Sequence, residues 1–242
     1  MPDYLYAVLF TGVGFAIGYI VLSRTKFKLL AFITRVIVSA LAIVLAVLSA
    51  YAVWGGLNLK STLSIIFVLV AVILYVLNDI LQAVVVDFKT KISSKMVKYI
   101  DFCLNILANV LVFVSLVLIF GFSYYTLIWF CILAGVFYYV NTLLYKAGYG
   151  KNLPFVIAYD CVLSLTLSQA ISSLAFGSYH TNIALFIMLA FLFFYIADFF
   201  KYGRLYIANQ DMKKDEVMDI FGLAMHYAGV LLTAMSVVFI FF

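Results

Sequence analysis

The sequence predicts an all-α integral membrane protein: a single transmembrane domain over residues 1–242, built from about eight helices that cross a bilayer. Hydrophobic residues make up 68% of the chain, charged residues make up 10%, and the mean hydropathy is +1.22. Soluble domains contain about 25% charged residues, so a water-soluble core would not hide this much apolar surface. The apolar runs reach the roughly 20 residues that a helix needs to cross the hydrocarbon layer. They lack the apolar and polar alternation of lipid-facing β-barrel strands.

The elements follow from these apolar runs, taken in order along the chain. The first run is full-length and follows Met1-Pro2-Asp3, which has no basic segment, so it predicts a transmembrane helix rather than a cleaved signal. Basic connections separate the first run from the second, the third from the fourth, the fifth from the sixth and the seventh from the eighth. The predicted spans are 4–22, 29–54, 62–86, 100–120, 124–145, 154–175, 182–200 and 217–242.

The distribution of lysine and arginine predicts the orientation, because these residues are retained on the cytoplasmic side of a membrane. Only Lys60 lies on an even connection. The other fourteen of the 15 lie in or beside odd connections: Arg24, Lys26, Lys28, Arg35, Lys89, Lys91, Lys95, Lys98, Lys146, Lys151, Lys201, Arg204, Lys213 and Lys214. Both termini are therefore expected on the non-cytoplasmic side of a plasma, inner or internal membrane. The net charge of +5 is a topology signal and does not indicate nucleic-acid binding.

Polar residues within the spans are informative, because an ionisable group in hydrocarbon is costly and usually faces a cavity, a partner or a substrate. By the predicted topology they all lie in the cytoplasmic half: Asn78, Asp79, Gln82, Asp101, Asn105, Asn109, Asn141, Asp160, Asp198 and His226. This predicts a polar pocket that opens toward the cytoplasmic leaflet. Two alternatives stay open: the outermost aspartates reach interfacial water, or the asparagines and Gln169 only bond one helix to another.

A faint internal repeat relates spans three and four to spans seven and eight. An offset of 119 residues pairs Asp79 with Asp198, and it also pairs Phe102 with Phe221 and Leu104 with Leu223. Four spans is an even number, so the halves would be parallel repeats about an axis along the membrane normal. The two aspartates would then lie at the same depth.

Several short motifs resemble the YhhN family of lysoplasmalogenase-like membrane proteins, and the similarity runs along nearly the whole chain. Leu77-Asn78-Asp79 resembles the Leu-Gly-Asp element of span three, and Phe194-Tyr195-Ile196-Ala197-Asp198 resembles the Phe-x-x-Ser-Asp element of span seven. The remaining matches are Arg24-Thr25-Lys26 before span two, the segment from Pro154 to Tyr159, and His226-Tyr227-Ala228. The chain departs from the family pattern at Phe27, Asn78, Asn109, Ala197 and Gly229.

The resemblance implies hydrolysis of the vinyl-ether bond of a lysoplasmalogen, a membrane lysophospholipid. Such bonds break by protonation of the carbon β to oxygen, and water then captures the oxocarbenium ion. This requires one carboxylic acid and one carboxylate. The implied catalytic residues are Asp79, preferred as the acid because it lies deeper, and Asp198 as the base, although the two roles can be exchanged. Substrate-binding residues would be Asn105, Asn109, Asp160, His226, Lys201 and Arg204. Lys201 and Arg204 would hold the lipid phosphate, and the alternative is that these two residues only determine the orientation in the membrane.

Other chemistries find less support in the sequence. His180 and His226 are predicted on opposite sides of the bilayer, and the three cysteines lie inside apolar runs without metal spacing, so neither a metal nor another cofactor is predicted. There is no Gly-x-Ser-x-Gly motif of a serine hydrolase. The main rival class is non-catalytic: a lipid-binding relative without activity, or a transporter that couples aspartate protonation to flux.

Overall fold

The computed structural model of the chain describes residues 3–53, 58–88, 94–140, 150–176, 181–206 and 216–240, and side chains within 85–88, 94–98, 151, 201–206 and 216–219 are left out of the description. Within these ranges the chain forms eight α-helices, two short 3-10 helices and no strand, which confirms the all-α prediction. The α-helices are α1 (Asp3–Leu22), α2 (Lys28–Val53), α3 (Leu59–Phe88), α4 (Ser94–Phe120), α5 (Tyr124–Tyr139), α6 (Leu153–Phe176), α7 (Thr181–Tyr206) and α8 (Glu216–Ser236). The 3-10 helices are η3 (Gly150–Asn152) and η5 (Val237–Ile240).

Seven of these helices are long and apolar enough to cross a membrane. Only a helix satisfies every backbone polar group within one segment, which is why apolar runs of this length become helices in lipid. The exception is α5, which is described over 16 residues, or about 24 Å at 1.5 Å per residue. The end of the predicted span 124–145 lies outside the described residues. The chain is therefore a multi-pass membrane protein.

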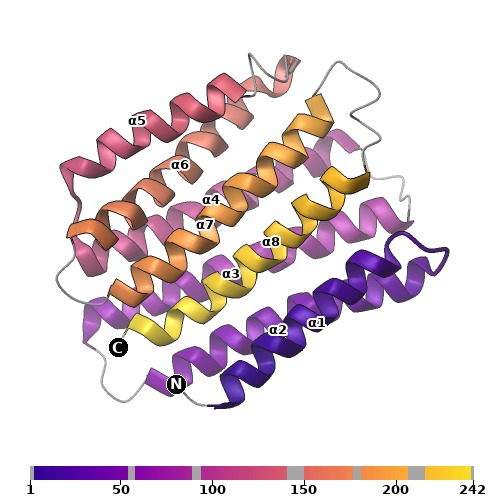
Figure 1. Cartoon of the computed structure of the whole chain (residues 1–242), viewed down its shortest axis with the longest axis horizontal. Coiled ribbons are helices and arrows are strands. Elements are labelled where there is room, and N and C mark those ends of the chain that lie inside the picture. The colour runs from indigo at the N-terminus through magenta and orange to yellow at the C-terminus, as the bar shows by residue number, and fades with distance from the viewer. Residues whose placement is uncertain are drawn as a thin grey trace.

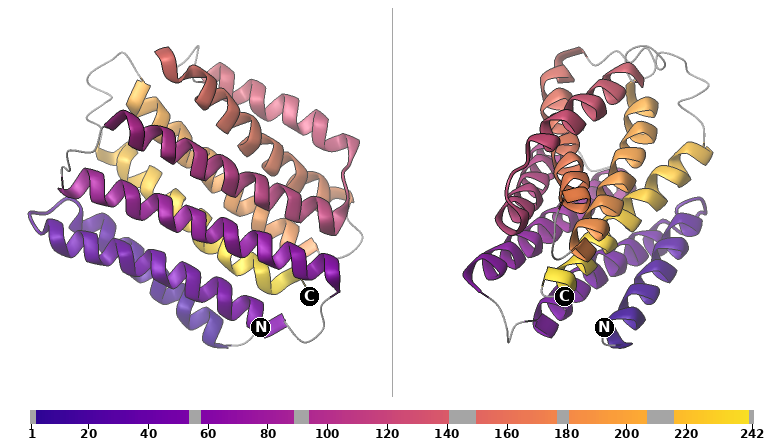
Figure 2. Two further views of the ribbon diagram at one scale, coloured as in Figure 1. Left: turned by 180° about the vertical axis from the view of Figure 1, so that it is seen from behind. Right: turned by 60° about the vertical axis from the view of Figure 1, so that its left-hand side comes forward.

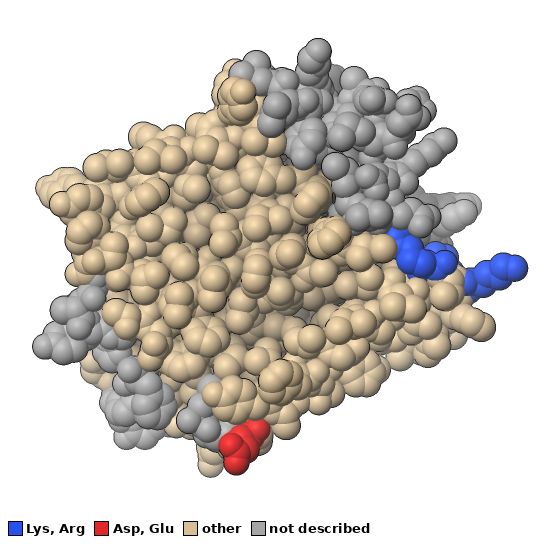
Figure 3. Space-filling model, viewed as in Figure 1, with Lys and Arg blue, Asp and Glu red and all other residues tan. Residues whose placement is uncertain are grey.

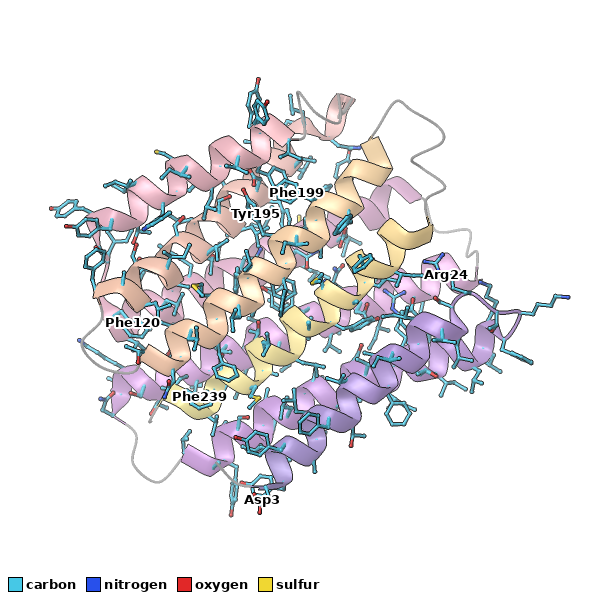
Figure 4. The ribbon with its side chains drawn as sticks, in the orientation of Figure 1. Asp3, Arg24, Phe120, Tyr195, Phe199 and Phe239 are labelled. Atoms are coloured by element: carbon cyan, nitrogen blue, oxygen red, sulfur yellow. The ribbon has the colours of Figure 1, made fainter. Side chains whose placement is uncertain are left out.

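Consecutive helices run antiparallel, and the two termini lie at the same end of the bundle (Figures 1 and 2). On the face drawn in Figure 3, basic side chains gather at one end and an acidic side chain lies near the other, with uncharged surface between them. Asp3 and Arg24 mark the two ends of α1 (Figure 4). A charge-free girdle between charged ends is the surface expected around a hydrocarbon layer.

The first four helices and the last four pack in matching pairs. The most extensive contacts are those between α3 and α4 and those between α7 and α8, and these two are nearly equal. The contact of α2 with α3 is likewise about as extensive as that of α6 with α7, and α1 packs on α2 as α5 packs on α6. The crossing contacts correspond as well, since α4 packs on α6 and α8 packs on α2. Tyr75 and Phe194, which the 119-residue offset pairs, pack ring on ring with centroids 5.0 Å apart. These pairs agree with the two four-helix halves that the repeat suggested.

Small residues allow the closest helix contacts, as is common in membranes. A Cβ added to Gly229 of α8 would lie 2.6 Å from Cε1 of Phe194 and 3.0 Å from the carbonyl oxygen of Ala190, so α7 and α8 approach there as only glycine permits. Gly121 ends α4 with φ of +76° and donates its N–H to the Val117 carbonyl at 2.8 Å, a glycine C-cap.

Candidate functional site

The most densely bonded group in the bundle surrounds Asp79 of α3. Arg35 lies about two turns into α2, and its Nε and Nη2 donate to Oδ1 of Asp79 at 3.0 and 2.7 Å. Ser39, one turn further along α2, donates to Oδ2 at 2.8 Å, and the Tyr227 hydroxyl of α8 lies 3.2 Å from the same oxygen. Arg35 and Asp79 are each 5% exposed. Three helices thus converge on one buried ion pair.

The donors around Asp79 identify its charge state. An ionised carboxylate only accepts hydrogen bonds, and here two guanidinium N–H groups and two hydroxyls point at it. A buried guanidinium without a counter-ion would be far costlier than the pair, so each residue maintains the charge of the other. Asp79 is therefore held as a carboxylate, which suits electrostatic stabilisation of a cation better than proton donation.

Arg35 corrects one part of the sequence analysis. It was counted with the basic residues that flank the first connection, but its side chain is buried inside the bundle and bonded to Asp79. It also donates to the Tyr19 hydroxyl at 3.2 Å, with its Cζ 5.4 Å from the centre of that ring. Of the other fourteen basic residues, thirteen lie in or beside odd connections, so their distribution predicts the same orientation without Arg35.

A small cavity lies beside this group. Its volume is about 10 Å³, room for about one water molecule. Asp79, Ser39, Tyr75, His226 and Tyr227 supply polar atoms to its lining, and aliphatic side chains of α2, α3 and α8 make up the rest. The cavity therefore places an apolar wall directly against a carboxylate and a half-buried histidine.

A second group joins α6 and α7 around Asp198. The Tyr159 hydroxyl donates to Oδ2 of Asp198 at 2.6 Å, and Ser164 donates to Asp160 at 3.2 Å. Asp160 and Asp198 lie close enough for their charges to interact. In Figure 4, Tyr195 lies on α7 near Phe199, and its hydroxyl bonds the Leu133 carbonyl of α5. Two carboxyls thus share one buried region.

A third group surrounds Asp101 of α4. Its Oδ1 accepts amide N–H groups from Asn78, Gln82 and Asn105 at 2.7, 2.5 and 2.9 Å. The first two of these bonds tie α3 to α4. Gln169 has a similar role elsewhere, accepting from Thr126 at 2.9 Å and donating to the Gly121 carbonyl at 2.8 Å. The bonds of Gln169, like those of Asn78 and Gln82 to Asp101, are the interhelical bonding that the sequence analysis kept as an alternative, whereas Asn105 bonds Asp101 within α4.

The predicted site residues thus fall into separate neighbourhoods. Asp79 and His226 line the cavity, Asp160 and Asp198 lie together between α6 and α7, Asn105 belongs to the Asp101 group, and Asn109 accepts from the Tyr75 hydroxyl. Tyr75 connects two of these neighbourhoods, because it lines the cavity and its hydroxyl donates to Asn109. Lys201 and Arg204 fall in the last turns of α7, where side chains lie outside the described residues.

Sequence reasoning missed the partners of the aspartates. These are Arg35, Ser39, Tyr159 and Tyr227, and it also missed Tyr75, which donates to Asn109. One signal was available: Arg35 and Ser39 are four residues apart, on one face of α2, and Arg35 lies well inside span 29–54. Among the described residues no three His, Cys, Asp or Glu side chains are grouped as metal ligands.

The fold and these groups define a polytopic α-helical membrane protein with carboxylates buried between its helices. Comparison with protein-family models, with curated proteins and with solved structures finds no match.

Proposed function

We propose that the protein is a membrane lipid hydrolase, resembling the lysoplasmalogenases, that cleaves the vinyl-ether bond of a lysoplasmalogen. The observation that carries the proposal is the cavity in which aliphatic side chains lie beside the ion-paired carboxylate of Asp79. An alkenyl chain needs apolar walls, and its vinyl-ether carbons need an acid and an anion beside them.

The geometry favours catalytic roles opposite to those preferred from the sequence, with Asp198 as the acid and Asp79 as the carboxylate. Asp79 is held as a carboxylate by Arg35, Ser39 and Tyr227, so it stabilises the oxocarbenium ion. Asp198, the other carboxyl of the implied pair, accepts the Tyr159 hydroxyl, and in this proposal it delivers the proton.

The proposed reaction balances with water as the only co-reactant. The proton adds to the carbon β to the ether oxygen, and the electron pair of the double bond forms the new C–H bond. Water adds to the resulting oxocarbenium carbon and gives a hemiacetal. Loss of the glycerol oxygen then releases a fatty aldehyde and a glycerophospho compound, and the water proton restores the acid.

We further propose that the Arg24 end of α1 faces the cytoplasm and that both termini are non-cytoplasmic. The asymmetry of the basic residues supports this orientation. Asp79, near the inner end of α3, would then meet lipid from the cytoplasmic leaflet. Lys201 and Arg204, at the same end of α7, would hold its phosphate.

A second candidate is proton-coupled transport. The observation in its favour is the cavity itself, which at about 10 Å³ admits water but requires side chains to move before a lipid enters. Buried carboxylates connected by hydroxyl groups also suit a proton relay. A transporter would show flux that depends on a pH gradient and would release no aldehyde.

The deciding assay is aldehyde release from lysoplasmalogen by purified protein without added metal. Asp79→Asn and Asp198→Asn should each lower kcat about 100-fold or more, the usual scale for losing a positioned acid or charge. Asp101→Asn is the matched control, because Asp101 is equally buried but belongs to the α3–α4 amide group. Wild-type protein that releases no aldehyde, or an Asp101 variant as inactive as the other two, would contradict the proposal.

A further inference from the structure

The two ends of the Asn109 amide are in different situations. Oδ1 accepts the Tyr75 hydroxyl, whereas Nδ2 has no hydrogen-bond partner within the described residues, although Asn109 is only 1% exposed. A buried donor without an acceptor is destabilising, because it loses the hydrogen bond that it makes to water in the unfolded chain. Three other buried polar atoms also have no hydrogen-bond partner among the residues that the structure describes: the hydroxyls of Ser49 and Ser172 and the amide oxygen of Asn78. A hydroxyl can rotate toward a nearby backbone carbonyl, and the amide of Asn78 already donates its N–H to Asp101, so Asn109 is the amide whose donor is unused.

The Tyr75 hydroxyl occupies one end of the amide and leaves the other end available. Its hydroxyl has one proton, and donating it to Oδ1 leaves the amide NH₂ turned the other way. The ring cannot swing aside easily, because it packs on Phe194 at 5.0 Å. The backbone of Asn109 is held too, since Thr166 of α6 donates to its carbonyl at 3.2 Å.

The surroundings indicate the class of ligand. Asn109 lies near the middle of the apolar span Tyr99–Phe120, far from the ends of the bundle where a phosphate would stay hydrated. Tyr75 also lines the cavity, together with Asp79 and His226. An amide donor at this depth suits a neutral oxygen acceptor carried into the bundle by an apolar chain.

We propose that Nδ2 of Asn109 donates a hydrogen bond to the ether or hydroxyl oxygen of a bound lysolipid, and that Tyr75 is the positioning residue that holds the amide in that orientation. This inference rests on the proposed function and extends it, because it states where the oxygen next to the scissile bond binds. Tyr75 acts through Asn109 and not on the substrate.

The test measures binding with a lipid that cannot be cleaved. The probe is a 1-O-alkyl lysophosphatidylethanolamine, whose saturated ether has no double bond to protonate, and its Kd is measured by titration calorimetry in detergent. Asn109→Leu and Tyr75→Phe should each raise Kd about tenfold, the scale of one hydrogen bond. The double variant should be no weaker than either single variant, because both remove the same bond. Ser115→Ala, a control further along α4, should bind like wild type.

The outcomes separate the two proposals. Wild-type protein that does not bind the probe, a Tyr75→Phe variant with unchanged Kd, or additive losses in the double variant would each overturn the subsite. The predicted binding pattern in a protein that never releases aldehyde would support the subsite and overturn the hydrolase. Tyr75→Phe keeps the ring and its packing, so it decides the matter even if Asn109→Leu fails to fold.

Discussion

At the residue scale, the buried ion pair between Arg35 and Asp79 has the clearest consequence for stability. Both groups are buried in a layer where an unpaired charge is costly, and each satisfies the other at 2.7 Å. Such a pair need not stabilise the protein relative to two apolar residues, but breaking it leaves one uncompensated charge.

Arg35→Leu should therefore lower the free energy of unfolding by about 3–5 kcal/mol, the usual cost of orphaning a buried charge. Adding Asp79→Leu should restore most of this loss, because no charge then remains unpaired. Denaturant unfolding in detergent measures both effects. Lys28→Leu, at the exposed start of α2, is the control and should change stability by less than about 0.5 kcal/mol. A single variant as stable as wild type would show that the pair is not formed.

The ion pair itself could not be predicted from the sequence. The sequence analysis counts Arg35 with the topology residues because it follows the basic first connection, and a lysine or arginine in the first turns of a span can extend to water. Its partner is 44 residues away, and neither hydropathy nor spacing indicates which face of α2 meets α3. Asp79, Asp198 and His226 were recognised because an ionisable group in a span is conspicuous alone, whereas Tyr75 and Tyr227 resemble ordinary interfacial aromatics.

At the element scale, the helix positions follow from apolar run length, and most ends agree with the predicted spans within a few residues. The larger differences are at the basic end of the bundle: α4 begins at Ser94 rather than residue 100, and α7 continues to Tyr206 rather than 200. These turns are polar, so an apolar run stops before the helix does. The lengths of the apolar runs do not predict how α7 packs against α8, because this packing depends on the absence of a side chain at Gly229.

Gly229→Ala should destabilise the protein by about 1–3 kcal/mol, since the added methyl group would lie 2.6 Å from the Phe194 ring and force α7 and α8 apart. Gly14→Ala, in α1, meets no atom within 4 Å and should be neutral or slightly stabilising, because alanine is the better helix former. Thermal unfolding of the two variants side by side measures the contrast. Equal effects would mean that the close approach of α7 and α8 is absent.

At the scale of the whole molecule, Asp79 lies on the third helix and Asp198 on the seventh, and each is bonded to the helix before its own, α2 and α6. The two aspartates differ in their partners: Asp79 is bonded to an arginine, whereas Asp198 accepts from the Tyr159 hydroxyl and interacts with the Asp160 carboxyl. This asymmetry is the physical basis for assigning them different roles.

The orientation of the bundle has its own prediction. In a variant without the native cysteines, Phe27→Cys at the basic end should react with an impermeant maleimide only after the cells are permeabilised. Tyr124→Cys, at the opposite end and at a position that is 86% exposed, should react in intact cells. The expectation follows from the basic residues that gather at the first end. The reverse labelling pattern would place both termini in the cytoplasm.

The most direct measurement of the central claim is hydrolysis of lysoplasmalogen in D₂O, with the aldehyde trapped at once and weighed by mass spectrometry. Protonation of the carbon β to oxygen by a carboxyl that exchanges with solvent should place one deuterium on the carbon next to the aldehyde. Asp198→Asn should slow its formation about 100-fold or more. Failure to form aldehyde, or aldehyde that carries no deuterium at that carbon, would contradict vinyl-ether hydrolysis by this pair of carboxyl sites.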